Sequence, residues 1–232
     1  MTADPARRLV AEALGTGLLV ATVVGSGIMA DALSTDDAVS LLANTLATGA
    51  VLVVLITILG PLSGAHFNPA VSMVFALRGE IGPGLALGYA AAQVVGGIAG
   101  CLLAHLMFDL PVWQLSSTVR TGTGQWLAEA VATFGLVATI LGGLRARPDA
   151  VPVLVGLYIT AAYWFTASTS FANPAVAVAR AFSDTFAGIR PADVPAFVAA
   201  EIAGAVLAYA VMRWLLREVV AREGLEPSTS RL

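Results

Sequence analysis

The sequence predicts an all-α membrane protein with six transmembrane helices and two short re-entrant half-helices, arranged as an inverted repeat of three plus three spans. The first observation behind this prediction is the composition. Hydrophobic residues make up 58% of the 232 residues and charged residues only 12%, whereas soluble domains carry roughly 25% charged residues. The mean hydropathy is +0.85. The second observation is a set of six long apolar stretches, and the third is a similarity between the two halves of the chain.

Six stretches of the chain are long enough to cross a bilayer. A helix needs about 20 apolar residues to span a hydrocarbon core of about 30 Å. The candidate spans cover residues 8–29, 39–59, 85–107, 125–144, 151–167 and 194–216. Two further apolar stretches, 68–77 and 173–182, contain only about ten residues each, so we expect them to enter the membrane without crossing it.

The two halves of the chain resemble each other. The segment that begins at Ala11 (AEALGT) is similar to the one that begins at Ala128 (AEAVAT), and Asn-Pro-Ala-Val occurs at Asn68 and again at Asn173. This predicts one membrane domain with a first repeat over residues 1–110, a second repeat over 111–222 and a flexible cytoplasmic tail over 223–232. Because each repeat has an odd number of spans, the second enters the membrane from the opposite face. Such an inverted repeat places a solute pathway near the bilayer midplane.

The arginines predict the orientation of the chain. There is no lysine, and nine of the 12 arginines fall on the side of the two termini in the predicted topology. Only Arg120, Arg180 and Arg190 fall on the other side. The positive-inside rule therefore places both termini in the cytoplasm.

Each short apolar stretch has the signature of a helix that begins inside the membrane. Asparagine is a strong N-cap, and proline is favoured at the first helical position, so helices are expected to begin at Asn68 and Asn173. A ten-residue helix rises about 15 Å, which reaches from the midplane to one face. Irregular backbone precedes each of them, and at membrane depth such backbone is tolerated where it lines a watery cavity. We therefore expect pore-lining carbonyls in two runs that include Gly64, Ala65, His66, Thr169 and Phe171.

The composition and motifs exclude several other classes of function. A net charge of −3 without a basic patch is unsuited to binding nucleic acid. The single cysteine, Cys101, allows neither an intramolecular disulfide nor a thiolate metal cluster. The sequence has no nucleophile–histidine–acid set and no phosphate-binding loop, so we expect no enzymatic activity, no metal and no cofactor.

The chain has two Asn-Pro-Ala motifs, each in a re-entrant position of one half of a six-span inverted repeat. This combination is highly specific for one family of membrane proteins. Through Asn68-Pro69-Ala70 and Asn173-Pro174-Ala175 the chain resembles the major intrinsic proteins, the aquaporin and aquaglyceroporin family, over residues 8–217. The resemblance implies a passive channel for water and small neutral solutes. It also implies a homotetramer in the lipid bilayer with one pore in each subunit, and two half-helices that meet at the pore centre.

Three glutamates lie within the predicted spans. An intramembrane ionisable residue is a functional candidate by default, so Glu12, Glu129 and Glu201 leave open a proton-coupled transporter. The resemblance implies instead that Glu12 and Glu129 brace the re-entrant loops by accepting hydrogen bonds from their backbone. Gln93 occupies the position in the first half that matches Glu201 and cannot relay a proton in the same way.

The chain departs from the family where selectivity is set. The arginine that usually follows the second motif is replaced by Val176, and the nearest arginine, Arg180, lies one helical turn farther on. Carried over by spacing, the other positions of the family's selectivity filter are Thr48, Ala161 and Ser170. These small residues imply a wide opening that passes glycerol, urea and neutral metalloids such as arsenite.

Bacterial members with valine at this filter position resemble a subgroup associated with arsenic resistance. That resemblance extends the expected solutes to methylated arsenicals and implies a location in the bacterial inner membrane. A water-selective aquaporin is the alternative within the same family.

Overall fold

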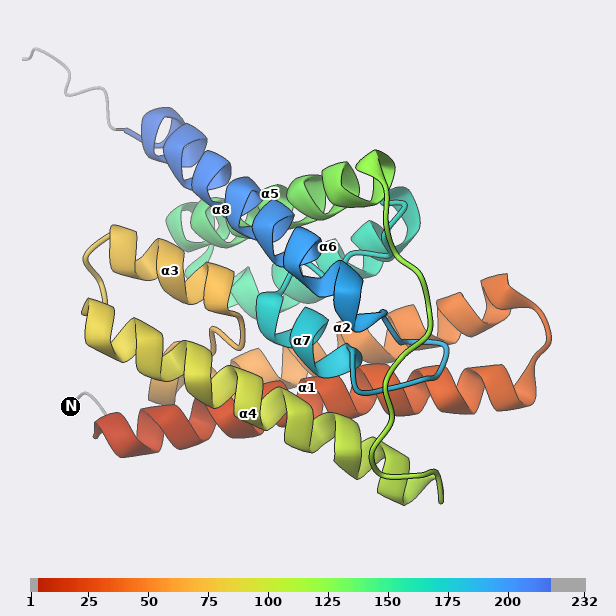
Figure 1. Cartoon of the computed structure of the whole chain (residues 1–232). Coiled ribbons are helices and arrows are strands. Elements are labelled where there is room, and N and C mark those ends of the chain that lie inside the picture. Colours follow the sequence, from red (N-terminus) through yellow and green to blue (C-terminus); the bar gives the residue numbers. More distant parts are fainter. Residues whose placement is uncertain (1–3, 218–232) are drawn as a thin grey trace, which may run out of the picture.

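The computed structural model describes residues 4–217, and every regular element within this range is a helix (Figure 1). Eight α-helices follow one another along the chain, with a short 3₁₀ turn (η) before α6 and another before α8. They are α1 Pro5–Leu33, α2 Asp37–Ser63, α3 Pro69–Leu77, α4 Pro83–Met107, α5 Thr123–Ala146, η1 Pro148–Ala150, α6 Val151–Phe165, α7 Pro174–Arg180, η2 Pro191–Asp193 and α8 Val194–Leu215. The predicted tail over 223–232 and two of the arginines used for the orientation, Arg222 and Arg231, lie outside the described residues.

The predicted all-α membrane fold is confirmed. Six helical segments within the described residues are long and apolar enough to cross a membrane, and they coincide with the six predicted spans. The helices of the first half extend beyond the predicted stretches, because polar residues such as Asp37 and Ser63 continue α2 at its two ends. The span predicted to end at residue 167 ends at Phe165.

The two short helices begin at their Asn-Pro pairs. The side-chain oxygen of Asn68 accepts the Ala70 N–H at 2.9 Å, and that of Asn173 accepts the Ala175 N–H at 3.0 Å. Proline occupies the first turn of both helices, where it has no intrahelical N–H to lose. With nine residues, α3 rises about 14 Å, which is about half of a bilayer core.

Glycines allow two pairs of long helices to pack closely, one pair in each half. α1 packs on α4, and α5 packs on α8. A Cβ added at Gly96 of α4 would overlap the Ala13 carbonyl oxygen, and a Cβ at Gly204 of α8 would overlap the Ala130 carbonyl oxygen. Small residues permit such close backbone approach in membranes, where packing rather than the hydrophobic effect joins helices.

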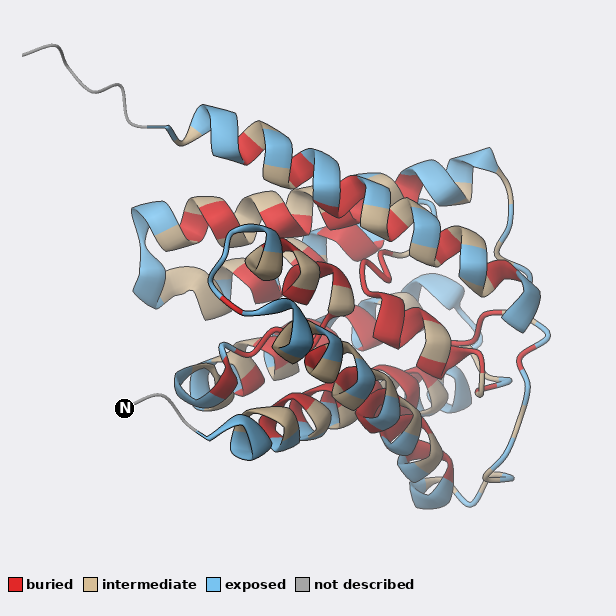
Figure 2. Ribbon diagram, turned by 60° about the vertical axis from the view of Figure 1, so that its left-hand side comes forward, coloured by how far each residue is buried: buried red, intermediate tan, exposed pale blue. Residues whose placement is uncertain are grey.

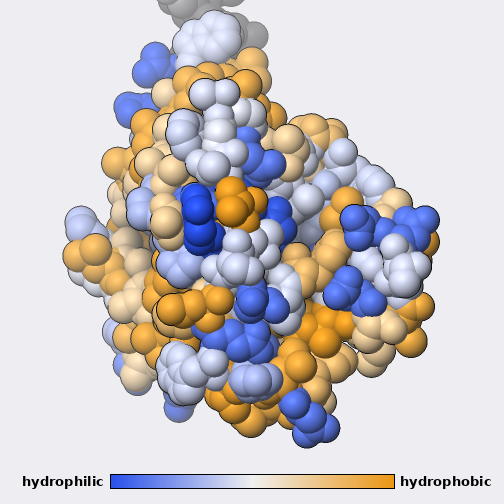
Figure 3. Space-filling model, turned by 45° about the vertical axis from the view of Figure 1, so that its right-hand side comes forward, coloured by the Kyte–Doolittle hydropathy of each residue, from blue (hydrophilic) through white to orange (hydrophobic). Residues whose placement is uncertain are grey.

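The outer surface of the helical bundle is apolar. Buried residues face the interior and exposed residues the outside of the bundle (Figure 2). The exposed residues of the long helices include large apolar ones such as Leu87, Leu127 and Leu157. On the side shown in Figure 3, hydrophilic residues gather toward the middle and apolar residues fill much of the surrounding surface. A bilayer accounts for this distribution, because lipid tails cover apolar side chains without a free-energy penalty.

The segment that joins the two halves, residues 108–122, runs past the end of α7 (Figure 1). Its backbone is fixed there, since the Ser116 N–H donates to the Ala181 oxygen at 3.0 Å and the Thr118 oxygen accepts the Arg190 N–H at 2.7 Å. The segment therefore brings Arg120 close to the second re-entrant loop.

Candidate functional site

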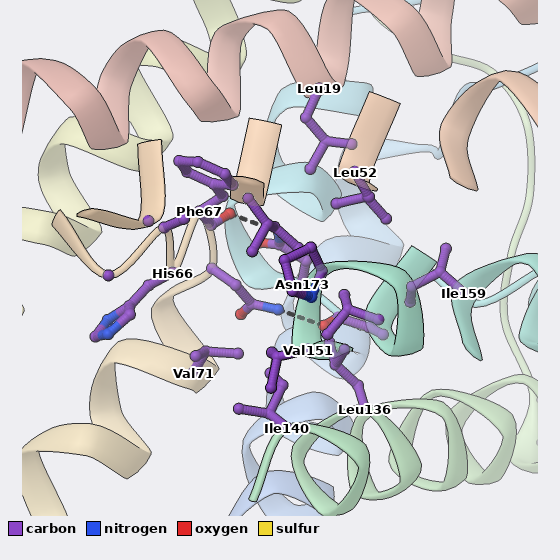
Figure 4. Close-up of a pocket in the computed structure, with 18 of the residues that line it drawn as sticks. Leu19, Leu52, His66, Phe67, Val71, Leu136, Ile140, Val151, Ile159 and Asn173 are labelled. Carbon is purple, nitrogen blue, oxygen red and sulfur yellow. Dashed lines mark hydrogen bonds between the residues drawn. The ribbon is translucent and has the colours of Figure 1, made fainter. Parts of the chain in front are cut away.

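The two half-helices meet near the centre of the molecule through their capping asparagines. Asn68 Nδ2 donates to the Ala172 oxygen at 2.7 Å, and Asn173 Nδ2 donates to the Phe67 oxygen at 2.8 Å (Figure 4). Each amide group thus caps its own helix through oxygen and holds the opposite loop through nitrogen. An amide nitrogen carries two hydrogens, so one N–H of each asparagine remains for another acceptor.

The loops before the half-helices adopt an unusual backbone conformation. Positive φ angles occur at Ala65 (49°), Phe67 (48°), Thr169 (61°), Ser170 (52°) and Ala172 (49°), in residues other than glycine. Such conformations are sparsely populated and persist only where surrounding contacts impose them. The same alternation in both halves turns successive backbone groups in different directions.

In the first half, a buried carboxylate supplies contacts that impose this loop conformation. Glu12 accepts the His66 N–H at 3.0 Å and the Phe67 N–H at 2.6 Å. Its remaining hydrogen bonds come from the Ser63 hydroxyl and from Gln93 Nε2, at 2.6 and 2.7 Å. With four donors around it, the carboxylate has no capacity left for a passing solute.

In the described part of the chain, the second half repeats the two backbone contacts but not the two side-chain donors. Glu129 accepts the Phe171 N–H at 2.9 Å and the Ala172 N–H at 2.7 Å. Glu201, at the position that matches Gln93, accepts the Asn173 N–H at 2.9 Å through Oε1. Its Oε2 has no hydrogen-bond partner among the described residues. These contacts fix the second loop from two helices, α5 and α8.

Asn68 and Asn173 line a cavity of about 580 Å³. Its wall is mostly apolar and includes Leu19, Leu52, Val71, Leu136, Ile140, Val151 and Ile159, which surround Asn173 in Figure 4. The lining extends from Asp149 in η1, on the side of the termini, to Arg180 at the end of α7, on the opposite side. The cavity therefore reaches toward both ends of the bundle.

Most of the residues expected along a pore do line this cavity. Both capping asparagines belong to the lining, and so do Gly64, Ala65, His66 and Phe171, whereas Thr169 does not. The Pro69-Ala70 and Pro174-Ala175 pairs begin the half-helices beside it. Of the four expected filter positions, Thr48, Ser170 and Val176 line the cavity.

The position expected at Ala161 is different. Ala161 is exposed on the outer face of α6 and is not part of the cavity wall, whereas Ile159 and Tyr163 of the same helix are. Residues 159 and 163 are four apart and share a helix face, and residue 161 between them points to the other side. The residue twelve positions before Asn173 therefore lies on the outer face of α6. The Tyr163 hydroxyl instead reaches across the cavity end and donates to Thr48 Oγ1 at 3.3 Å.

Arg180, expected one helical turn beyond the filter, lines the cavity. It follows Val176 by four residues on α7, so the two side chains share a helix face. Arg180 and Tyr163 are thus two cavity residues that counting from the motif did not select. The i, i+4 relationship to Val176 was the signal in the sequence for Arg180.

The described residues hold no group of three or more His, Cys, Asp or Glu side chains that could bind a metal ion. Cys101 is buried in α4 and is not part of the cavity wall. His105, one turn on, makes contacts at 2.8 Å with the Val112 oxygen and at 2.9 Å with the Ser183 hydroxyl. These contacts tie α4 to the connecting segment and to the end of α7.

Comparison with known proteins gives a consistent set of similarities. The family profile described as major intrinsic protein matches residues 1–170. The chain is 71% identical over 214 residues to the aquaglyceroporin AqpS of Rhizobium meliloti, covering 92% of each chain. It is 32% identical to aquaporin A of Dictyostelium discoideum, covering 94% of this chain and 85% of that protein. The X-ray structure of the aquaglyceroporin from Plasmodium falciparum matches in fold, with a TM-score of 0.72 and 21% identity over 89% of this chain and 95% of that one.

Proposed function

The chain belongs to the major intrinsic protein family and is therefore a multi-pass membrane channel for water and small solutes rather than an enzyme, and we propose that solutes pass through the cavity between α3 and α7. The observation that carries this proposal is the meeting of the two half-helices at the cavity wall. Asn68 and Asn173 each retain one N–H for a solute oxygen. Water or a polyol can exchange hydrogen bonds there, whereas an ion loses far more solvation.

The ends of the half-helices contribute to selectivity at the centre of the cavity. The N-terminus of a helix carries about half a positive charge, and α3 and α7 both direct this end toward the asparagine pair. Two such ends facing one short stretch of the passage oppose the entry of cations, including hydronium.

The solutes are proposed to include molecules larger than water. Thr48, Ser170 and Val176 are small, and the residue after the second motif is not arginine. The proposed solutes are glycerol, urea and neutral metalloids such as arsenite or methylated arsenicals. The 71% identity to a protein named an aquaglyceroporin supports a range wider than water alone.

A proton-coupled transporter finds no support in the cavity. Glu12, Glu129 and Glu201 are buried and none of them is part of the cavity wall. The backbone hydrogen bonds that the three carboxylates accept support a bracing role for Glu12 and Glu129 and a structural one for Glu201.

We further propose that residues 1–110 and 111–222 act as two repeats of one channel domain, in a homotetramer of the bacterial inner membrane with both termini in the cytoplasm. The repeated order of two long helices, one half-helix and one long helix supports the two repeats. The distribution of arginine supports the orientation.

The test is stopped-flow light scattering on proteoliposomes, with water and glycerol gradients applied separately. The proposal expects fast entry of both solutes, linear in concentration and unchanged by a pH gradient. The variant Val176→Arg should slow glycerol more than water, because a long side chain would fill the opening beside Thr48 and Ser170. Rapid water entry without glycerol entry in the parent protein would contradict the wide opening, and equal glycerol flux in parent and variant would remove Val176 from the constriction.

A further inference from the structure

The guanidinium group of Arg180 is buried at the cavity wall and only partly satisfied by the protein. Only 2% of the residue is exposed. Its Nε donates to the Ala187 oxygen, but its Nη1 is buried without a hydrogen-bond partner. Arginine cannot give up its proton in a protein, so the unpartnered N–H groups remain donors. A buried donor of this kind is costly unless something else supplies an acceptor.

A second unpartnered polar group lines the same cavity. Ser170 Oγ is buried and has no hydrogen-bond partner among the described residues. Ser170 directly precedes Phe171, and the Arg180 guanidinium carbon lies 3.4 Å from the centre of the Phe171 ring. A group that only donates and a hydroxyl that can donate or accept therefore both lack a protein partner on the wall of one cavity. A neutral solute with hydroxyl groups can satisfy both, by accepting from Arg180 and exchanging a hydrogen bond with Ser170.

A second arginine keeps this region positive. Arg120, from the segment that joins the halves, lies 5.1 Å from the centre of the same Phe171 ring. Its Nε donates to the Gly188 oxygen at 2.8 Å. Burial lowers the pKa of Arg120, but arginine ordinarily titrates so far above neutrality that the group keeps its charge. Within residues 4–217, neither Arg120 nor Arg180 forms an ion pair with a carboxylate.

We propose that Arg180 is the charged, solute-contacting residue of the outer constriction, and that it acts together with Ser170. In this arrangement Val176 sets the width of the opening, while Arg180, one turn along α7, supplies the hydrogen-bond donor and the barrier to cations. Width and charge are therefore set by two different residues. The inference rests on the proposed function, since it concerns the path of the solute through the cavity.

Two substitutions separate the charge of Arg180 from its structural hydrogen bond. Arg180→Gln removes the charge but places an amide N–H where Nε of Arg180 donates to the Ala187 oxygen, whereas Arg180→Lys keeps the charge and has a methylene group at that position. Arg190→Gln is the matched control, because Arg190 lies on the same side of the molecule, has a 43% exposed side chain and is not part of the cavity wall. Each variant is reconstituted, and potassium, methylammonium, water and glycerol fluxes are compared with the parent protein. Thermal unfolding in detergent checks the fold of each variant.

The Arg180→Gln variant should admit methylammonium or potassium at least about tenfold faster than the parent protein. Removing one unit charge close to the path of the cation, in a medium of intermediate dielectric, lowers the energy barrier to cation entry by well over the thermal energy. The lysine and Arg190→Gln variants should exclude cations as the parent does. A folded Arg180→Gln variant that excludes cations as well as the parent would overturn the proposal.

The contact with the solute has its own test, which holds even where the glutamine variant does not fold. Lysine lacks the forked donor, so Arg180→Lys should lower the glycerol permeability relative to that of water, and Ser170→Ala should lower it in the same direction. Unchanged glycerol-to-water ratios in both variants would overturn the contact. Absence of water and glycerol flux in the parent protein would instead refute the proposed function.

Discussion

Asn68 and Asn173 hold each other's loops. The amide of Asn68 donates to the oxygen of Ala172, the residue just before Asn173, and the amide of Asn173 donates to the oxygen of Phe67, just before Asn68. The two halves are thus joined at the centre by a reciprocal pair of hydrogen bonds, 2.7 and 2.8 Å long. Each asparagine has two separable roles, a helix cap made by oxygen and a cross-link made by nitrogen.

Serine in place of asparagine separates these two roles. Asn68→Ser retains a capping oxygen but cannot reach the Ala172 oxygen, and Asn68→Ala loses both contacts. The serine variant should be less stable than the parent by about 1 kcal/mol and the alanine variant by about 2 kcal/mol. Thermal unfolding in detergent measures the order. A serine variant as stable as the parent would show that the hydrogen bond from Asn68 to the Ala172 oxygen does not contribute to stability.

Helix packing in the first half should depend on Gly96. A methyl group at this position would overlap the Ala13 carbonyl oxygen of α1, so Gly96→Ala should destabilise the protein by about 1–3 kcal/mol. Gly84, near the start of the same helix, has open space beside it and provides the control. If both alanine variants melt at the same temperature as the parent, α1 and α4 do not cross as closely as the contact between Gly96 and the Ala13 oxygen requires.

The two carboxylates of the second half should respond differently to neutralisation. Each oxygen of Glu129 accepts one buried N–H, from Phe171 or from Ala172. In Glu129→Gln an amide NH₂ replaces one of these oxygens, so one N–H loses its acceptor. The free energy of unfolding should fall by about 2 kcal/mol or more. Glu201→Gln keeps the one oxygen that accepts from Asn173 and places an amide where Gln93 already stands in the first half. Its stability should lie within about 1 kcal/mol of the parent.

Flux through the Glu201→Gln variant decides between a channel and a transporter. Solute permeability should be unchanged, because Glu201 is not part of the cavity wall. A loss of flux in a variant that unfolds at the same temperature as the parent would instead support a transporter that couples to protons through Glu201.

Mercurial reagents should block the channel only weakly. Cys101 is fully buried in α4 and lies outside the cavity wall, so neither the lipid face nor the passage presents the thiol. Water flux after treatment with mercuric chloride is compared between the parent and Cys101→Ser. Strong block that disappears in the serine variant would place the thiol in the passage.

The sequence predicted the fold because the fold depends on local signals, and the two asparagines it singled out lie on the cavity wall. Length and apolarity define the six spans, and an Asn-Pro pair defines where a half-helix begins. Ser170 and Val176 also line the cavity, because only a few positions separate them from Asn173 along the chain. Over so few residues, the chain between the motif and these two side chains has little freedom to turn them away from the cavity.

Positions farther from the motif depend on helix phase. Ala161 is 12 residues before Asn173, and irregular backbone lies between α6 and α7, so helical counting from Asn173 does not give the face that α6 turns to the cavity. A shift of two residues moves a side chain to the other side of a helix, and Tyr163 takes the place beside Thr48. Thr169 was likewise expected on the wall and is not part of it.

The sequence by itself determined the membrane class, the six spans, the two half-helices and the pair of asparagines at which they begin. Only the tertiary structure decided which atoms meet: the exchange of hydrogen bonds between Asn68 and Asn173, and the placement of Arg180 against Phe171 at the cavity. The physical reason is that helix formation depends on neighbours along the chain. The direction of a side chain in a cavity depends instead on the packing of elements far apart in sequence.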